Sequence, residues 1–253
     1  MNPNKQLYGT VLLKADRILL FLSSSDSPQK LKQIAAGADL TNPTTLKILD
    51  TLIYIGYVEK DSETKKFSLG PSIIKYANKG IQQLDIKRIA QPHLEKLQKS
   101  TTETVHLGIL DNSSIVYITK LKSSNPVSLN SKVGKSIPLY CSAMGKSILA
   151  DQSDHEIQEY LENHQLVPKT NNTITSKKVF IQEIESIRKQ GISFDNSENE
   201  DDVFCIGTSI SLNGKIYGAI SVSVPKYRIN SEFRNDIMEA VKACKTNILS
   251  ELV

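Results

Sequence analysis

The segment from Asn42 to Leu52 constrains the fold more than any other part of the chain. It opens with Asn-Pro, a capping residue followed by proline, which is a common start of a helix. Residues that suit a protein interior then recur at positions i, i+3, i+4 and i+7, the spacing of one helix face: Thr45, Ile48, Leu49 and Leu52. The opposite face stays polar, with Pro43, Lys47, Asp50 and Thr51. We therefore predict a short helix with one buried and one polar face.

Two further helices are expected before this one. The first covers residues 7–22 and turns one face inward, with Leu12, Ala15, Ile18, Leu19 and Leu22. After a polar break, Ser27 is a candidate cap and Pro28 a candidate first helical residue. This second helix is expected to bury Leu31, Ile34 and Ala35 and to stop near residues 37–39. Two short helices joined by a tight turn are typical of a helix-turn-helix.

The polar face of the helix that starts at Asn42 is the candidate nucleic-acid surface. A helix of this kind fits the major groove, and its first amides favour phosphate. The side chains predicted to contact phosphates or base edges are Asn42, Thr44, Lys47 and Thr51. Leu46 could touch a thymine methyl group, but Ile53 lies on the same flank. We therefore expect Leu46 to pack against the first helix.

A β-hairpin is predicted directly after this helix. Gly56 ends the helix, Tyr57 begins an extended segment, and the turn-rich residues 61–64 precede a second alternating segment at 65–69. Lys65 and Lys66 are candidate contacts to the DNA backbone or minor groove. A solvated hairpin without specific contacts is the alternative. Attachment to the helix pair favours a DNA-binding wing.

The net charge of the chain lies in the same region. Residues 1–80 contain 11 Lys and Arg against 7 Asp and Glu, whereas residues 81–253 contain 20 of each. Positive charge confined to a small domain suits a polyanionic partner, although a solvated surface would explain an excess of this size equally well. No stretch is apolar enough to cross a bilayer and no signal peptide is evident, so we expect no membrane association. Three scattered cysteines fit neither a disulfide framework nor a zinc site, and a cytoplasmic protein is expected.

A different pattern fills the rest of the chain, where short helices separate antiparallel strands. The expected helices cover residues 86–97, 144–150, 179–190 and 232–252. The expected strands cover residues 105–110, 115–121, 127–133, 192–194, 203–212 and 216–224, and Asn213-Gly214 is a two-residue hairpin turn. This arrangement predicts an α+β domain.

The sequence does not support an enzymatic site. Gly145-Lys146-Ser147 resembles the end of a phosphate-binding loop, but Tyr140 stands where that motif requires glycine. No local signature of a cysteine nucleophile surrounds Cys141 or Cys205. The acidic loop at residues 195–202 lacks the order of an EF-hand and is expected to be solvated. We therefore expect no catalytic residue, no metal and no cofactor.

Motifs in a consistent order along the chain resemble the IclR family of bacterial transcriptional regulators. In the first third, the resemblance rests on residues 15–19, 33–35, 44–52, 56–58 and 67–71. In the remainder, it rests on residues 92–97, 103–107, 133–134, 138–139, 143–146, 191–195, 205–206 and 221–225.

The resemblance implies an α+β protein with three parts. These are a winged helix-turn-helix at residues 1–70, a linker helix at 71–84, and a GAF-like effector-binding domain with a curved antiparallel sheet at 85–253. It further implies a homodimer, in some members a tetramer, on double-stranded operator DNA. The implied effector is a small organic acid or a related metabolite. A repressor is expected rather than an activator, since most members repress.

The resemblance also places four residues in an effector pocket, namely Asp195, Cys205, Ser221 and Ser223. The sequence itself shows that the two serines share a strand face, because they alternate with Val222; without the family they would be taken as structural. Separately, the backbone amides of Ala143, Met144 and Gly145 lie at an expected helix start and are candidates to hold a ligand carboxylate.

Four positions depart from the family pattern. Asp39 replaces a glycine in the helix-turn-helix turn, where it is expected to tolerate left-handed backbone angles. Thr45 replaces a core valine, and Tyr140 and Asp202 replace a histidine and a glycine expected at or near the pocket. Two alternative functions remain open: a redox-sensing regulator that uses Cys205, and a metabolic enzyme whose N-terminal domain only mediates oligomerisation.

Overall fold

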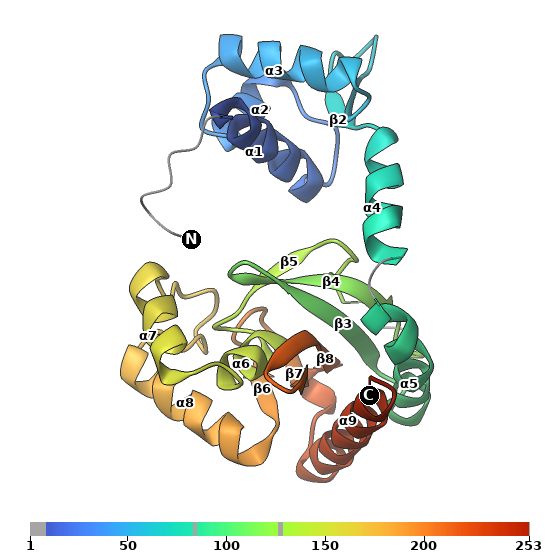
Figure 1. The fold of residues 1–253 in the computed structure, drawn as a ribbon, viewed down its shortest axis with the longest axis vertical. Helices are drawn as coiled ribbons and strands as arrows, with labels where there is room; N and C mark the ends of the chain where they lie inside the picture. The colour runs from blue at the N-terminus through green and yellow to red at the C-terminus, as the bar shows by residue number, and fades with distance from the viewer. Residues whose placement is uncertain (1–8, 83–84, 126–128, 253) are drawn as a thin grey trace. The chain divides into compact units, whose positions relative to one another are not determined.

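The computed structural model describes residues 9–82, 85–125 and 129–252 (Figure 1). The chain forms two compact units, Met1–Gln83 and Leu84–Val253. The first unit has one hydrophobic core, and the second has two.

The first unit is a winged helix-turn-helix followed by one more helix. Its elements in chain order are α1 (Thr10–Ser24), α2 (Leu31–Gly37), α3 (Asn42–Tyr54), β1 (Val58–Lys60), β2 (Phe67–Leu69) and α4 (Ser72–Gln82). Strands β1 and β2 pair antiparallel, with Val58 opposite Leu69. Ile18, Ile34, Leu49 and Phe67 meet in the core of this unit. The predicted helix pair and hairpin are thus confirmed.

Two predicted features of α1 and α2 are wrong. Leu12 is 71% exposed, so the inward face of α1 begins further along the helix, where α2 and α3 cover it. Helix α2 begins at Leu31 rather than at Pro28. The reason is a backbone bridge: Gln29 N donates to Phe67 O at 2.9 Å, and Phe67 N donates to Gln29 O at 2.8 Å. The segment after Ser27 is therefore extended and cannot start the helix.

Helix α3 buries the four predicted residues, but its cap lies one position earlier than expected. Thr41 caps the helix by accepting a hydrogen bond from Thr44 N at 3.4 Å, and Asn42 is the first helical residue. The buried hydroxyl of Thr45 is satisfied because it donates to Thr41 O at 3.0 Å. Asp39 adopts the expected left-handed backbone, with φ of 52°. Leu46 is 38% exposed, so the expectation that it packs in the core is wrong.

The second unit is built on one six-stranded antiparallel sheet in the order β5-β4-β3-β8-β7-β6. Its strands are β3 (Thr104–Asp111), β4 (Ser114–Leu121), β5 (Ser136–Pro138), β6 (Ser193–Asn196), β7 (Val203–Leu212) and β8 (Lys215–Pro225). Irregularities after Leu107 and Ile210 accompany the curvature of the sheet, visible in Figure 1. The turn at Asn213 and Gly214 has positive φ at both residues, as a two-residue hairpin requires.

Helices cover both faces of this sheet. Helices α5 (Asp85–Thr101) and α9 (Ser231–Ser250) lie side by side on one face and bury one core (Figure 1). Helices α6 (Ala143–Ala150), α7 (Asp154–Asn163) and α8 (Lys177–Gln190) build the other core, and a 3-10 turn covers Lys226–Arg228. The α+β class is confirmed.

Three details of the second unit differ from the prediction, and the first is that β5 was not predicted. Residues 129–133, part of the predicted strand at 127–133, are not in a strand; residues 126–128 lie outside the described part of the chain. The Lys120 ammonium instead holds this segment by donating to Leu129 O at 2.7 Å and to Ser131 O at 2.6 Å. Helix α7 was not predicted, because only Ile157, Tyr160 and Leu161 mark its buried face.

Candidate functional site

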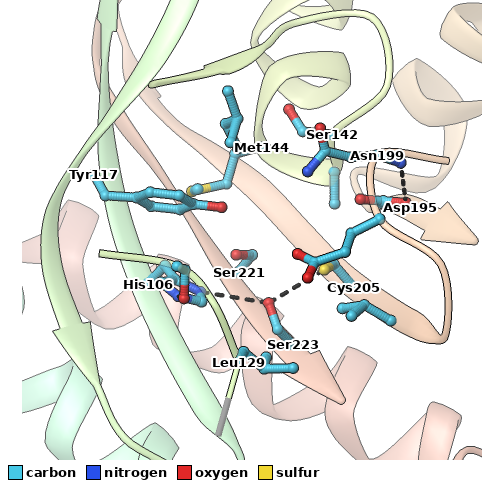
Figure 2. A pocket seen from close by; sticks show the side chains of 15 residues that line it. His106, Tyr117, Leu129, Ser142, Met144, Asp195, Asn199, Cys205, Ser221 and Ser223 are labelled. Carbon is cyan, nitrogen blue, oxygen red and sulfur yellow. Dashed lines mark hydrogen bonds between the residues drawn. The ribbon is translucent and has the colours of Figure 1, made fainter. Parts of the chain in front are cut away.

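A small cavity lined by both polar and apolar side chains lies between the concave sheet and the start of α6 (Figure 2). Its volume is about 30 Å³. Strand register explains the grouping: Asp195 pairs with Cys205, Cys205 with Ser223, and Ser221 with His106. The residues that line the cavity are His106, Tyr117, Leu129, Ser131, Ile137, Ser142, Ala143, Met144, Asp195, Asn199, Glu200, Val203, Cys205, Ser221 and Ser223.

The start of α6 forms one wall of the cavity. Ser142 caps the helix: its hydroxyl accepts from Gly145 N at 3.1 Å and donates to Pro138 O at 2.7 Å. Gly145 is therefore not available to a ligand, does not line the cavity, and packs tightly on Leu139 instead. Ala143 and Met144 do line the cavity, and as the first helical residues their N–H groups have no carbonyl partner in the helix. The expected amide site is thus reduced to these two residues.

Asp195 contributes a buried carboxyl group to the cavity. Its Oδ1 accepts hydrogen bonds from Glu198 N at 2.7 Å and from Asn199 N at 3.3 Å. Burial raises the pKa of Asp195 to about 7, because the charged form loses its hydration. Ser197 and Glu198 are also buried, so the expectation of a solvated acidic loop at residues 195–202 is wrong for its first half.

Lys146 explains why that loop turns inward. Its side chain is fully buried, and its ammonium group contacts Glu198 Oε1 at 2.6 Å and Glu183 Oε1 at 2.8 Å. Burial raises the pKa of the Glu198 carboxyl, and the adjacent ammonium opposes this shift. Lys146 therefore forms an internal ion pair, and this pair anchors residues 195–202, which include Asp195 and Asn199.

A chain of polar contacts runs along the floor of the cavity. Figure 2 shows Ser223 between Cys205 and His106: its hydroxyl is 3.1 Å from Cys205 Sγ and 3.4 Å from His106 Nδ1. The other ring nitrogen of His106 is 2.7 Å from Ser131 Oγ. Burial lowers the pKa of His106 to about 3, so the ring is neutral. Burial also raises the pKa of Cys205 well above its usual value, so the thiol stays protonated.

Two of the family departures, Tyr140 and Asp202, do not line the cavity themselves, but each lies within two residues of a residue that does, Ser142 and Val203. Tyr140 donates its hydroxyl to Val167 O at 2.7 Å, and Asp202 has a positive φ and accepts from Lys226 N. Conversely, His106, Tyr117 and Asn199 line the cavity but were not predicted to do so. The alternating pattern around His106 indicated a strand face, but the partner strand β8 lies far along the chain.

The candidate DNA-binding side chains lie together on the first unit. Asn42, Lys47 and Thr51 are exposed on α3 and Thr44 is half-buried, while Lys65 and Lys66 lie on the hairpin between β1 and β2. The hydroxyl of Thr51 donates to Lys47 O at 3.2 Å, which leaves its lone pairs free to accept. One polar helix face and one basic hairpin are thus presented by a single compact unit.

Comparisons with known proteins decide the family. The family model for the bacterial transcriptional regulator IclR C-terminal domain matches residues 78–250, and the model for the IclR helix-turn-helix domain matches residues 11–62. The chain belongs to the IclR family. The transcriptional regulator KdgR of Escherichia coli K12 is 32% identical to this IclR-family member over 203 residues, which are 80% of this chain and 77% of KdgR. The transcriptional repressor IclR of the same organism is 26% identical over 238 residues, 91% of this chain and 87% of that protein.

Solved structures of IclR proteins share the fold. The crystal structure of Thermotoga maritima IclR has a TM-score of 0.73 and 32% identity, over 96% of this chain and 98% of that one. An IclR homolog from Microbacterium hydrocarbonoxydans, crystallised with 4-hydroxybenzoate, has a TM-score of 0.80 and 21% identity, over 96% of this chain and 98% of that one. This IclR-family chain is accordingly a DNA-binding transcriptional regulator and not an enzyme. Within the described residues, no helix has the length and apolar character needed to span a membrane.

Proposed function

We propose that this protein is a transcriptional repressor whose affinity for operator DNA is controlled by a small organic acid bound in the cavity of the second unit. One observation carries the effector part. Ser221 and Asp195 are 3% and 4% exposed, line the cavity, and have polar atoms without a protein partner among the described residues. Buried polar groups are normally paired, so such atoms point to a ligand or ordered water. The Microbacterium homolog, which was crystallised with an aromatic acid, supports an acid as the ligand.

The DNA-binding part rests on α3 and the adjacent hairpin. Asn42, Thr44, Lys47 and Thr51 would contact phosphates and base edges in the major groove, and Lys65 and Lys66 would contact the backbone or the minor groove. Residues 1–70 would thus form the reader, residues 71–84 a linker helix and residues 85–253 the effector-binding domain. The boundary between the two compact units after Gln83 and the helix at Ser72–Gln82 support this division into three parts.

A homodimer is the assembly that fits the first unit. Leu12, Leu20, Ile74 and Tyr76 are each more than half exposed on α1 and α4. An apolar groove of about 420 Å³ between these helices is lined by Leu19, Leu20, Ile73 and Tyr76, among others. Pairing through this surface would cover it and present two copies of α3 to a palindromic operator. Effector binding would shift the population of protomer arrangements and so the spacing of the two helices.

Two further points complete the proposal. The protein would act in the cytoplasm, where its three cysteines, which form no disulfide, remain reduced. The redox alternative has little support, because a reactive sensor cysteine needs a thiolate, whereas burial keeps the Cys205 thiol protonated. An oxidant should therefore leave regulation by the wild-type protein unchanged.

Selection of binding sites from fragmented genomic DNA, followed by titration of the best site, tests the DNA-binding role of residues 1–70. Lys47→Ala should weaken operator binding by about 10-fold or more and reduce its salt dependence, because a phosphate or base contact is lost. Lys177→Ala is the matched control, since Lys177 is an exposed lysine of α8 in the other unit. Equal affinities of Lys47→Ala and wild type for the operator would refute the assignment of α3 as the DNA-contacting helix. Failure to enrich any sequence would refute sequence-specific DNA binding.

A further inference from the structure

Helix α3 carries an acidic side chain near the centre of its polar face. The buried stripe of the helix consists of Thr45, Ile48, Leu49 and Leu52. At about 100° per residue, Asp50 lies within about 30° of the direction opposite this stripe. Asp50 is exposed, and among the described residues it has no hydrogen-bond or ion-pair partner. Its carboxylate is therefore free to contact whatever α3 binds.

A carboxylate at this place opposes DNA binding in general. Duplex DNA carries one negative charge per about 1.7 Å of its axis, so the phosphates repel Asp50 whatever the base sequence. An ionised carboxyl group only accepts hydrogen bonds, and the phosphates and deoxyriboses of the backbone offer it no donor. The repulsion is therefore offset only where a base presents a donor to Asp50.

The base edges of the major groove narrow that partner to cytosine. Only two bases present donors there, cytosine through its N4 amino group and adenine through its N6 amino group. In adenine the donor lies beside the N7 acceptor, which the second oxygen of a carboxylate would approach, whereas in cytosine the neighbouring group is C5–H. Thymine and guanine present acceptors instead. Asp50 therefore favours a C·G pair and penalises the other three.

Leu46 lies one helical turn before Asp50 on the same flank of α3, and it is 38% exposed. Positions four residues apart are separated by about 6 Å along the helix axis. This distance spans one or two base steps of about 3.4 Å each. Thymine is the base that carries a methyl group in the major groove, and contact with an exposed leucine removes apolar surface of both from water. A thymine close to the cytosine is the partner that suits Leu46.

We propose that α3 contacts a cytosine through Asp50 and a thymine one or two base pairs away through Leu46. The proposal rests on the proposed DNA-binding role of residues 1–70 and adds the identity of two base pairs in each half-site. Lys47 and the basic hairpin attract DNA of any sequence. Asp50 and Leu46 then determine which sequences keep that affinity.

Selection of binding sites from a random duplex library, with full-length wild type and with Asp50→Asn, tests the cytosine contact. Asparagine keeps the size of the exposed side chain and removes its charge. For the wild type, we expect one position in each half-site where C·G is bound at least about 5-fold more tightly than any other pair. Asp50→Asn should lose this preference at that position alone. It should also bind DNA that lacks the site about 3-fold more tightly, because the repulsion from the phosphates is removed.

The matched control is Asp236→Asn, which makes the same change at an exposed position of α9 in the second unit. This variant should keep both the base preference and the affinity of the wild type for DNA without the site.

Deoxyuridine tests the thymine contact, because it differs from thymidine only by the missing methyl group. At one thymine within two base pairs of the cytosine, this replacement should weaken wild-type binding by about 3-fold. Leu46→Ala should bind the two duplexes equally, because the side chain that contacts the methyl group is absent.

The outcomes separate the base contacts from DNA binding itself. If the wild type enriches no sequence, the proposed DNA binding is overturned and the base contacts with it. If the wild type enriches a site but Asp50→Asn keeps every preference, or weakens binding to all sequences equally, the cytosine contact is overturned and DNA binding stands. Loss of preference at a pair other than C·G overturns the choice of cytosine. Equal effects of deoxyuridine on wild type and Leu46→Ala overturn the thymine contact.

Discussion

Replacement of Lys146 by methionine tests how the wall of the cavity is held in place. The ammonium of Lys146 is fully buried and contacts Glu198 and Glu183. Methionine has a similar length and is apolar, so the substitution removes the charge without opening a large cavity. The substitution leaves the Glu198 carboxyl group buried without its ion-pair partner, and the second oxygen of this group already has no hydrogen-bond partner.

The two partners of Lys146 contribute unequally to the expected cost. The side chain of Glu198 is 6% exposed and cannot turn to solvent, whereas that of Glu183 is 29% exposed and can be rehydrated. Breaking a buried ion pair costs about 3–5 kcal/mol. Because only one carboxyl group is fully stranded, we expect Lys146→Met to lower the free energy of unfolding of the second unit by about 3 kcal/mol at pH 7.5. Lys146→Met combined with Glu198→Gln should recover about 2 kcal/mol of this loss, since the stranded charge is removed.

The loss should also depend on pH. Burial raises the pKa of Glu198, and removal of the ammonium group raises it further. A carboxyl group with a raised pKa in the folded state destabilises the protein at high pH, and this penalty shrinks as the pH falls toward the pKa of the unfolded chain. The deficit of Lys146→Met relative to wild type should therefore be largest above pH 7 and smaller at pH 5.

Urea denaturation followed by far-UV circular dichroism is the suitable assay, because the chain has no tryptophan. Lys242→Met is the matched control: Lys242 pairs with Glu239 on the exposed surface of α9, and its loss should cost no more than about 0.5 kcal/mol. The reasoning is refuted if Lys146→Met costs no more than this control. It is also refuted if the double substitution recovers nothing.

Two further predictions concern single side chains. Asp195→Asn should raise the free energy of unfolding by about 1–3 kcal/mol at pH 8 and by almost nothing at pH 4, because the pKa of Asp195 is raised to about 7 and its charged form is disfavoured in the folded state. Urea denaturation at both pH values measures this, and a gain at pH 4 equal to that at pH 8 would contradict it. Thr41→Ala should lower the stability of the first unit by about 1 kcal/mol, whereas Asn42→Ala should lower it much less, because Thr41 is the cap of α3. Thermal melts of the two variants measure this, and a larger loss of stability for Asn42→Ala would identify Asn42 as the cap.

Local patterns in the sequence predicted most helices and strands. The apolar spacing in α3, the left-handed Asp39 and the Asn213-Gly214 turn each depend on residues close together in the chain. The start of α2 was misplaced because its cause is a backbone bridge between Gln29 and Phe67, which no local pattern records. Leu12 fits the apolar spacing of α1 but lies beyond the reach of the other helices, so spacing alone overestimated its burial.

Contacts between residues far apart in the chain limited the prediction of the site even more than that of the fold. Asp195, Cys205, Ser221 and Ser223 were assigned to one pocket through the family resemblance, and the structure brings all four to one cavity. His106 was missed because its contact with Ser223 depends on the pairing of β3 with β8, which are far apart in sequence. Similarly, Lys146 stands in a motif that resembles a phosphate-binding loop, and only its folded neighbours, 37 and 52 residues away, reveal an internal ion pair.

The bridge between Gln29 and Phe67 has a consequence for operator length. It ties the segment that leads into α2 directly to a strand of the hairpin, so that the basic hairpin cannot swing independently of the helix pair. Each protomer would then touch a stretch of duplex of fixed width. Operators of different length could be accommodated only by changes between protomers, and half-sites should therefore keep a constant size while the spacer between them varies.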